Sequence, residues 1–423
     1  MLNIIYDATQ LVDGENNNSV RRGIYFVSLN ILKEMLKRTD VSVCLWTRPC
    51  KSFLLDEIRN KYFRNAISFY GNGSFACFLS KIITIIRLVA RKNEKHRILR
   101  KILWGMVYLG EFCIDSFFSS GSCCSHQTEK IFFSPQDAIP KQFQRKKDLK
   151  RFVVLYDTIP YKIVNLGSKS ENGWFWRLAK NMNSSDYYFA ISEATKKDFC
   201  TFKPQLKKEH IWVTPLAASD TFRPISDRRL LNEIKRKYNI PVDKKYIFSL
   251  CTLEPRKNLV RAVRCFLEFI SKHDINDFVW VMGGGQYKDF SEQIKGESSN
   301  LDLYDRCVQY AGYIEDVDLP ALYSDAEWFV FTSQCEGFGL PPLEAMQCGC
   351  PVITSNNSSL PEVVGDAGIM IDWDSDEQHV EAYEKYYFNK ELREECRRKG
   401  LERAKKFSWE KTVDKMICVM NEG

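Results

Sequence analysis

Short runs of β-branched and aromatic residues recur along the chain and alternate with segments whose apolar positions follow a helical period. Runs such as 152–156 and 328–331 are apolar throughout, which is typical of strands covered on both faces of a parallel sheet. The alternation therefore predicts βαβ units with right-handed crossovers. The expected strands are 2–6, 41–46, 131–134, 152–156, 187–191, 246–251, 278–282, 327–332, 351–354 and 368–371. The expected helices include 21–38, 258–272 and 341–348.

A boundary between two such series is expected near 215–245, because a polar, charged stretch runs from 222 to 237 and a fresh strand opens at Tyr246. The sequence therefore predicts an α/β protein with two facing Rossmann-like lobes of similar size, over residues 1–220 and 221–404. Each lobe is expected to contain a parallel sheet. Because ligands of open parallel sheets lie outside the carboxyl ends of the strands, we expect an inter-lobe cleft with a binding site on each wall.

The segment at about 75–125 departs from this rhythm, because basic and aliphatic residues are interleaved in it. Its cations are Lys81, Arg87, Arg91, Lys92, Lys95, Arg97, Arg100 and Lys101. A basic amphipathic helix can lie in a membrane interface and attract anionic lipid. The alternative is an insertion helix whose apolar side packs on its own lobe while its charges are solvated. Nucleic acid is not an expected partner, because no recognised nucleic-acid-binding motif accompanies the charge.

The composition is that of an ordinary soluble enzyme, with 44% hydrophobic residues, 27% charged residues and a mild net charge of +7. The longest apolar stretches, 75–90 and 102–118, contain charged residues and are shorter than the ~20 residues of a membrane span. The N-terminus reads as a buried strand and not as a secretory signal, so a cytoplasmic protein with 15 reduced cysteines is expected. No metal is expected, because neither Cys123-Cys124 nor Cys348-x-Cys350 has a second pair at zinc spacing.

The segment 333–346 (SQCEGFGLPPLEAM) carries the most chemical information, because it follows an apolar strand and runs into a helix. Its glycines allow backbone N–H groups to approach a ligand, and a helix N-terminus is a ready anion site. A diphosphate fits that site, and the residues expected to line it are Gly337, Phe338, Gly339 and Leu340.

Two glutamates flank this anion site, Glu336 in the loop and Glu344 in the first turns of the helix. A carboxylate accepts hydrogen bonds from vicinal hydroxyls, so Glu336 is expected to bind a sugar and Glu344 a ribose. The alternative for Glu344 is that it only complements the helix dipole.

A second element, 254–259 (EPRKNL), follows strand 246–251 and opens a helix. Adjacent cations are poorly placed at a helix N-terminus, whose dipole favours anions, so Arg256 and Lys257 require another reason to be there. Neutralising the charge of a leaving diphosphate is one such reason. The alternative is a pair of solvated surface cations.

The order EPRKN, Gly283-Gly284-Gly285, Tyr310-Ala311-Gly312-Tyr313-Ile314 and EGFGLPPLEA closely resembles family 4 glycosyltransferases of the GT-B fold, strongly over 246–371 and more weakly in the first lobe. The resemblance implies a retaining, metal-independent hexosyltransferase that uses a nucleotide-sugar, GDP-mannose or a UDP-hexose, without a further cofactor. At the level of the family, mannose is the favoured sugar. We expect a lipid-linked saccharide acceptor in surface polysaccharide (O-antigen or capsule) biosynthesis, because the basic amphipathic segment supports an acceptor at a membrane surface. The same segment supports a peripheral position on the inner face of the cytoplasmic membrane.

By the same resemblance, specific positions take family roles. Glu336 matches the sugar-facing glutamate, Glu344 the ribose-binding one, and Arg256 with Lys257 the phosphate-binding cations. The backbone at Tyr313-Ile314 is implied to face the base. The pair Arg22-Gly23 falls where the family has a loop near the acceptor and the phosphates. The tail, 405–423, resembles the closing helix that returns to the first lobe.

Two departures from the family pattern change the expected chemistry. Relatives often have glycine-arginine at the end of the first strand of the second lobe, where this chain has Leu250-Cys251-Thr252. Relatives often have histidine-aspartate where this chain has Tyr156-Asp157. Because a tyrosine has an ordinary pKa of ~10, Tyr156 cannot replace an imidazole near neutral pH. Any contact of this acceptor-side pair with substrate is therefore expected to be a hydrogen bond or stacking.

Retention without an obvious nucleophilic carboxylate favours front-side attack, in which the protein supplies placement and charge stabilisation. Two other readings are a GT-B nucleotide-sugar epimerase and a non-catalytic nucleotide-sugar-binding protein. Asp316-x-Asp318 and Asp372-x-Asp374 imitate a metal-binding pair, but they lie outside the required strand–turn context and are expected to be solvated loop residues.

Overall fold

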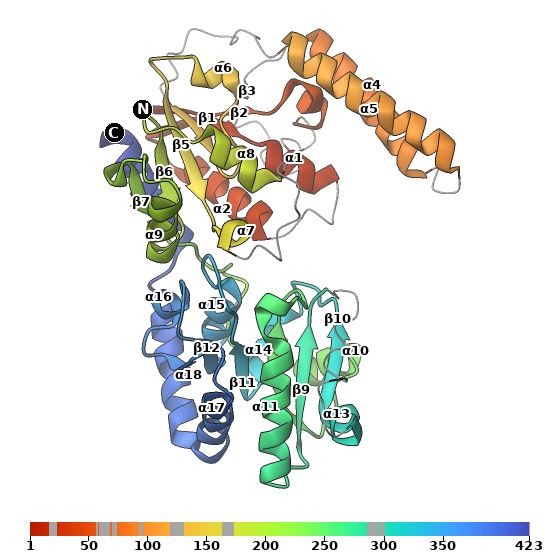
Figure 1. Cartoon of the computed structure of the whole chain (residues 1–423), viewed down its shortest axis with the longest axis vertical. Coiled ribbons are helices and arrows are strands. Elements are labelled where there is room, and N and C mark those ends of the chain that lie inside the picture. The colour runs from red at the N-terminus through yellow and green to blue at the C-terminus, as the bar shows by residue number, and fades with distance from the viewer. Residues whose placement is uncertain are drawn as a thin grey trace.

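The chain forms two parallel sheets, each at the centre of its own lobe (Figure 1). The computed structural model describes residues 1–16, 23–55, 58, 68–69, 74–92, 96–118, 131–162, 173–285, 296 and 301–422. Within these ranges, every strand pair is parallel. The expected α/β class with two parallel sheets is therefore confirmed.

The first sheet has the strand order β3-β2-β1-β4-β5-β6-β7. Its strands are β1 (Leu2–Asp7), β2 (Val41–Trp46), β3 (Ser68–Phe69), β4 (Ile131–Ser134), β5 (Lys150–Leu155), β6 (Tyr187–Ala190) and β7 (Ile211–Val213). The order reverses between β1 and β4, so the carboxyl ends of these two strands flank a topological switch point, where ligands of such sheets bind.

The second sheet has the order β10-β9-β8-β11-β12-β13. Its strands are β8 (Lys245–Leu250), β9 (Phe278–Gly283), β10 (Val308–Gly312), β11 (Trp328–Phe331), β12 (Val352–Ser355) and β13 (Gly368–Ile371). Its switch point lies between β8 and β11. The segment that contains Arg256 and Lys257 follows β8, and the segment that contains Glu336 follows β11, so the topology places both at the same sheet edge.

Helices and short 3-10 turns connect the strands. Those of the first lobe are α1 (Thr9–Asn16), α2 (Gly23–Lys37), η2 (Pro49–Lys51), α4 (Ser74–Lys92), α5 (Arg97–Phe118), α6 (Lys141–Gln144), α7 (Ile159–Lys162), α8 (Trp174–Asn181), α9 (Glu193–Phe202) and η3 (Lys208–His210). Those that follow are α10 (Arg228–Lys237), η4 (Pro255–Lys257), α11 (Leu259–Lys272), α13 (Leu301–Cys307), α14 (Leu319–Asp325), α15 (Leu340–Gln347), α16 (Leu360–Val364), α17 (Asp376–Phe388), α18 (Lys390–Ala404) and α19 (Trp409–Glu422).

The all-apolar runs form central strands, because helices cover both faces of each sheet. Trp280 on β9 and Trp328 on β11 are fully buried, and the Trp280 ring meets Phe266 of α11 edge to face, with ring centroids 5.3 Å apart. Every strand predicted from the pattern is present to within two residues at each end. The pattern missed β3, β7 and β10, which are edge or near-edge strands that are short or only partly buried.

The last helix, α19, packs on α2 of the first lobe, so the chain crosses back after completing the second sheet (Figure 1). The Thr412 hydroxyl donates a hydrogen bond to the carbonyl of Pro215 over 2.5 Å, and Arg38 forms an ion pair with Asp414. Apolar side chains of α19, including Met416 and Ile417, are buried in the core shared with α2. This crossing ties the two lobes together away from the gap between their sheets.

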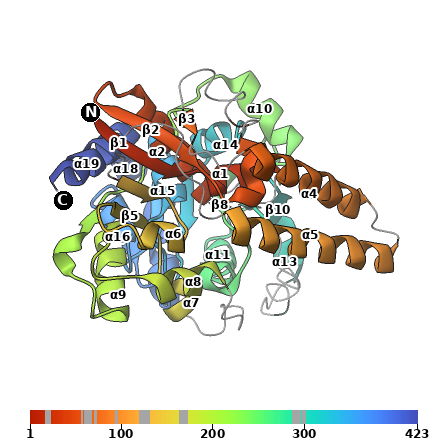
Figure 2. The same ribbon diagram turned by 90° about the horizontal axis from the view of Figure 1, so that it is seen from above.

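Helices α4 and α5 form a hairpin that projects from the first lobe (Figures 1 and 2). The basic segment between 81 and 101 therefore belongs to two antiparallel helices. Residues 93–95, which include Lys95, lie outside the described residues. None of the helices in the described ranges is both long enough and apolar enough to cross a bilayer.

Candidate active site between the two lobes

A cavity of about 350 Å³ opens where the carboxyl edges of the two sheets meet. It is lined by Gly23, Ile24, Val27, Tyr156, Asp157, Ile191 and Leu216 from the first lobe, and by Leu250, Cys251, Thr252, Lys257, Phe331, Glu336, Gly337, Phe338, Gly339, Leu340 and Pro341 from the second. Most of these residues lie at or just after the carboxyl ends of strands β5, β6, β7, β8 and β11. The cavity thus lies where ligands of open parallel sheets bind.

The Glu336 carboxylate lies against two cations at the wall of this cavity. Its Oε1 accepts hydrogen bonds from Lys257 Nζ over 2.5 Å and lies 3.0 Å from Arg256 Nη1. Burial acts to raise the pKa of Glu336, but the charges of Lys257 and Arg256 outweigh it and hold this pKa below its usual value. The side chain of Glu336 is therefore an anion that is only 11% exposed and rigidly placed.

Lys257 and Arg256 have different positions in this cluster. Lys257 lines the cavity, and its Nζ lies 4.8 Å from the centroid of the Phe331 ring. The Arg256 guanidinium lies behind, donating to the carbonyl of Cys335 and to Glu254 Oε1, each over 2.6 Å. Burial acts to lower the pKa of Arg256, and the carboxylates of Glu336 and Glu254 reverse that effect and raise it. Arg256 is thus placed to orient Glu336, while Lys257 faces the cavity.

The EPRKN segment folds as a 3-10 turn, η4, that precedes α11. Asn258 ends the turn in the left-handed region, with φ +59°, and its side-chain amide donates to the carbonyl of Trp373. This turn lets the cations leave the axis of α11 and approach the loop after β11, where Gln334 N donates to the Arg256 carbonyl over 2.9 Å. Arg256 and Lys257 therefore lie in a separate turn and not in the first turn of α11, where the helix dipole would disfavour them.

Two glycines shape the loop that leads into α15. A Cβ added at Gly337 would lie 2.5 Å from the backbone oxygen of Tyr156 in the opposite lobe, so only glycine allows this close approach. Gly339 precedes α15 with φ +116°, a conformation that L side chains rarely adopt. Phe338 and Leu340 lie between and beside them on the cavity wall, and the Phe338 ring meets Phe407 edge to face.

Hydrogen bonds join this loop directly to the first lobe. The hydroxyls of Ser192 and Thr195 donate to the carbonyl of Gly337 over 2.8 and 3.2 Å. In addition, the Glu362 carboxylate of α16 accepts from the backbone N–H groups of Glu193 and Ala194, each over 2.7 Å. A carboxylate of one lobe therefore caps the N-terminus of α9 in the other, which joins the two lobes.

Glu344 lies apart from the cavity-lining residues. Its Oε2 accepts a hydrogen bond from the Tyr323 hydroxyl over 3.2 Å. Burial raises the pKa of Glu344 to about 7, the charge of Asp316 adding to the increase. A carboxyl group with this pKa is partly protonated at neutral pH, and it retains acceptor and donor capacity for a hydroxyl partner.

Tyr156 and Asp157 both line the cavity, but they differ in orientation. The Tyr156 hydroxyl donates to the carbonyl of Pro135 over 2.7 Å, and the side chain is 5% exposed. Its phenol is therefore held in the first-lobe core. Asp157 Oδ1 accepts from Ile159 N over 3.0 Å, and burial raises the pKa of Asp157 above its ordinary value. Of this pair, Asp157 carries the polar group that faces the site.

The remaining predicted site residues are not all brought together. Gly23 begins α2 and lines the cavity, whereas Arg22 lies outside the described residues. Ile314 is buried against Gly283, and Tyr313 is 74% exposed in the turn after β10; neither lines the cavity. Nearby, a Cβ at Gly284 would lie 1.8 Å from the carbonyl oxygen of Cys251, which explains the glycine run after β9.

The sequence interpretation missed Ser192, Thr195 and Glu362 as residues that hold the site. Ser192 does have a local signal, because its hydroxyl accepts from Thr195 N as the N-cap of α9. Its second contact, with Gly337, spans 145 positions and has no local signature.

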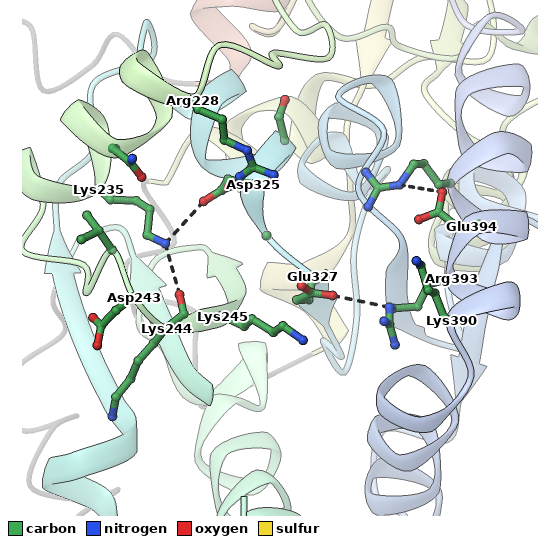
Figure 3. A pocket seen from close by; sticks show the side chains of 15 residues that line it. Arg228, Lys235, Asp243, Lys244, Lys245, Asp325, Glu327, Lys390, Arg393 and Glu394 are labelled. Atoms are coloured by element: carbon green, nitrogen blue, oxygen red, sulfur yellow. Dashed lines mark hydrogen bonds and ion pairs between the residues drawn. The ribbon is translucent and has the colours of Figure 1, made fainter. Parts of the chain in front are cut away.

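A larger cavity, about 540 Å³, lies at the opposite end of the second lobe, beside the amino ends of β8 and β11 (Figure 3). Its walls carry ion pairs, among them Arg228 with Asp325 at 2.7 Å and Arg393 with Glu327 at 3.5 Å. The Lys235 ammonium also donates to the carbonyl of Lys244 (Figure 3). The charged groups of this larger cavity mostly pair with one another. The candidate active site is therefore the smaller, inter-lobe cavity.

The expectation that Asp318 is a solvated loop residue is wrong. Asp318 is buried, and its Oδ2 accepts from Lys237 Nζ over 2.6 Å and from the Tyr238 hydroxyl over 2.7 Å. Its role is to join α10 to the loop before α14. Across the ranges that the structure describes, no cluster of three or more His, Cys, Asp or Glu residues is arranged to hold a metal ion.

Comparison with solved structures shows the same fold throughout the chain. Anabaena HepE, in complex with UDP and glucose, superposes with a TM-score of 0.63 at 14% identity, with complete coverage of both chains. WaaG, a glycosyltransferase involved in lipopolysaccharide biosynthesis, gives a TM-score of 0.60 at 13% identity, again with complete coverage of both chains. The expected GT-B fold is confirmed.

Sequence comparison identifies relatives of part of the chain. It is 31% identical over 244 residues to the O-antigen chain mannosyltransferase B of Escherichia coli, covering 57% of this chain and 61% of that protein. It is 28% identical over 267 residues to the serotype-specific mannosyltransferase WbdA of E. coli, covering 62% of this chain and 32% of that protein. The chain thus spans less than two thirds of the length of either relative. The glycosyl transferases group 1 family matches residues 232–403. Residues 232–403 therefore match the glycosyl transferases group 1 family, and part of the chain is homologous to the two E. coli mannosyltransferases.

Proposed function

We propose that this chain is a retaining, metal-independent mannosyltransferase that moves mannose from GDP-mannose to a lipid-linked saccharide in O-antigen or capsule biosynthesis. The observation that carries the proposal is the Glu336–Lys257 pair, in which an anion and a cation 2.5 Å apart line an inter-lobe cavity beside the N-terminus of α15. The names of the E. coli relatives support mannose as the sugar.

The donor would lie with its diphosphate at the loop 337–340. Backbone N–H groups at the start of α15 have no intrahelical partner, and the helix dipole favours negative charge there. The Lys257 ammonium faces the same space and supplies a positive charge to the diphosphate. Glu336 would accept hydrogen bonds from hydroxyls of the mannosyl group, and these bonds are shorter and stronger when the carboxylate is ionised. The low pKa of Glu336 keeps it in that form.

The ribose of the donor would reach Glu344 at the far side of the anion site. Its carboxyl group lies one helical turn into α15, where the Tyr323 hydroxyl donates a hydrogen bond to it. A diol that donates to this carboxylate would lower the pKa of Glu344 from about 7. Donor binding is therefore expected to release a proton from Glu344.

Transfer would proceed on one face of the sugar. The bond between the anomeric carbon and the β-phosphate oxygen breaks, the acceptor oxygen bonds to the anomeric carbon on the same face, and its proton passes to a diphosphate oxygen. Lys257 stabilises the charge that develops on the leaving diphosphate. Asp157, which lines the cavity from the first lobe, would accept a hydrogen bond from the acceptor and orient it. Because the acceptor is lipid-linked, we place the reaction at the inner face of the cytoplasmic membrane.

The test is product analysis with GDP-, UDP- and TDP-sugars, in the presence and absence of a lipid-linked saccharide. The expected result is an α-linked mannosyl product, with the configuration of the donor retained, only when acceptor is present. Glu336→Gln should lower kcat at least about 100-fold, whereas Glu402→Gln, an exposed acid on α18, should leave it unchanged. Near-normal turnover of Glu336→Gln contradicts the assignment.

The same assay separates the other readings. An epimerase would change the donor without any acceptor, and a non-catalytic binding protein would bind a donor without converting it. Transfer from a UDP-hexose instead of GDP-mannose would agree with the proposed mechanism and would show that the donor is a UDP-hexose.

A further inference from the structure

The α4–α5 hairpin has a closed inner contact and an apolar outer surface. Ile83, Val107 and Ile114 pack between the two helices, and Arg87 forms an ion pair with Glu111 across the same contact. The inward-facing positions are thus satisfied. Both figures of the whole chain show the hairpin extending away from the two sheets (Figures 1 and 2).

The outward-facing positions of both helices carry large apolar side chains at helical spacing. On α4, Phe78, Ile82, Ile85 and Val89 are 57%, 40%, 53% and 43% exposed. On α5, Ile98, Ile102, Met106, Leu109 and Phe112 are 78%, 55%, 51%, 65% and 70% exposed. Positions separated by three or four residues share one face of a helix, so each set forms a continuous stripe. Apolar patches of this extent on a protein surface mark interaction sites.

Positive charge is interleaved with these stripes. Among the described residues, the exposed cations of the hairpin are Lys81, Lys92, Arg97, Arg100 and Lys101. Its two described acids are already engaged, Glu111 with Arg87 and Asp115 with the backbone N–H of Cys50 over 3.0 Å. The outer surface is therefore apolar and cationic together. A second copy of the hairpin would bring like charges into contact, whereas an anionic lipid surface satisfies both features.

We infer that the α4–α5 hairpin is an arm that docks this protein on an anionic lipid bilayer. The aliphatic and aromatic side chains enter the interface, and the lysines and arginines contact lipid phosphates. The helices have 19 and 22 residues, so each is about 30 Å long. This length allows the arm to lie along a membrane surface while the lobes stay in water.

The arm belongs to the lobe that carries the acceptor side of the site. Its base packs on η2, where Ser80 donates to the Cys50 carbonyl, and Lys51 joins η2 to Asp13 of α1 by an ion pair of 2.6 Å. Docking would therefore fix the orientation of the first lobe relative to the lipid. That consequence rests on the proposed lipid-linked acceptor, whereas binding of the arm to lipid does not depend on it.

The experiment is co-sedimentation of the full chain with vesicles of phosphatidylcholine, with or without about one third phosphatidylglycerol. The wild type should sediment with the anionic vesicles only, and raised salt should release it. Arg97→Gln with Lys101→Gln should weaken partitioning about 25-fold, since each cation contributes about fivefold. Ile102→Ser with Phe112→Ser should weaken it at least about tenfold. Lys207→Gln with Lys208→Gln is the matched control and should bind as the wild type does, because these exposed lysines lie at the β7 edge of the sheet, away from the arm.

Two further measurements make each outcome decisive. Circular dichroism shows whether the hairpin variants keep their helices. Conversion of donor with a short water-soluble acceptor, at unchanged kcat in all these variants, shows that the site is intact. Equal vesicle binding of the wild type and both hairpin variants overturns the inference. So does a wild type that ignores lipid but forms a dimer that Ile102→Ser with Phe112→Ser dissociates. Vesicle binding by the arm together with no glycosyl transfer to any acceptor would contradict the proposed function and leave the docking arm standing.

Discussion

Replacing Glu344 by glutamine should change how the stability of the protein depends on pH. Burial raises the pKa of Glu344 from 4.5 to about 7 in the folded protein. A raised folded-state pKa means that folding favours the protonated form, so this group's contribution is fully present below pH 4.5 and is lost as the pH rises through 7. The difference of about 2.5 pH units corresponds to about 3 kcal/mol, the full cost of ionising the buried carboxyl group. Glutamine cannot ionise and avoids that cost.

The assay is urea unfolding of the wild type and Glu344→Gln at pH 5 and pH 8.5, followed by circular dichroism. The free energy of unfolding of the variant relative to the wild type should rise by up to about 3 kcal/mol between the two pH values. Asp7, whose pKa burial raises to about 6, titrates equally in both proteins and cancels from the difference. A saturating donor should reduce the effect, because ribose hydroxyls would stabilise the ionised carboxylate of the wild type. A difference in stability that does not change with pH would refute the burial argument.

Three other substitutions test the geometry of the closed site. Gly337→Ala should push the lobes apart and lower donor affinity at least about tenfold, because its Cβ would lie 2.5 Å from the Tyr156 oxygen. Calorimetry measures donor affinity, and the control is Gly105→Ala, whose Cβ would meet nothing within 4 Å. Glu362→Gln should weaken the cap on α9 and raise the KM for donor about fivefold, with Glu402→Gln as the matched control. In Arg256→Lys, the single ammonium cannot contact Glu254, Glu336 and the Cys335 carbonyl together, so kcat should fall at least about tenfold. The pKa of Glu336 should rise, and the acidic limb of the pH–rate profile should therefore move to higher pH. Unchanged donor affinity, KM or pH profile, respectively, would contradict each assignment.

Local pattern was sufficient for the strands and for the loop after β11. Runs such as 328–331 are apolar because both faces of the sheet are covered. Consecutive residues alone therefore reveal such a strand. The glycines at 337 and 339 similarly report a close backbone approach and a positive φ. Strand β10 was not predicted, because residues 308–312 are only partly buried and end in Gly312.

Long-range contacts were not available from local pattern. The closure of the lobes depends on Glu362, which contacts residues 168 and 169 positions away. The orientation of Tyr156 depends on the Pro135 carbonyl of the neighbouring strand connection. The basic segment was recognised as amphipathic, but its folding as two antiparallel helices depends on the match of Ile83 with Gly110, where a Cβ would lie 2.5 Å from the isoleucine side chain.

A crystal structure with GDP-mannose tests the central claim most directly. The account predicts the diphosphate against the backbone at 337–340 and within hydrogen-bond distance of Lys257 Nζ, with mannose hydroxyls on the Glu336 carboxylate. A donor found in the charged cavity beside the amino ends of β8 and β11, or one whose sugar makes no contact with Glu336, would contradict it.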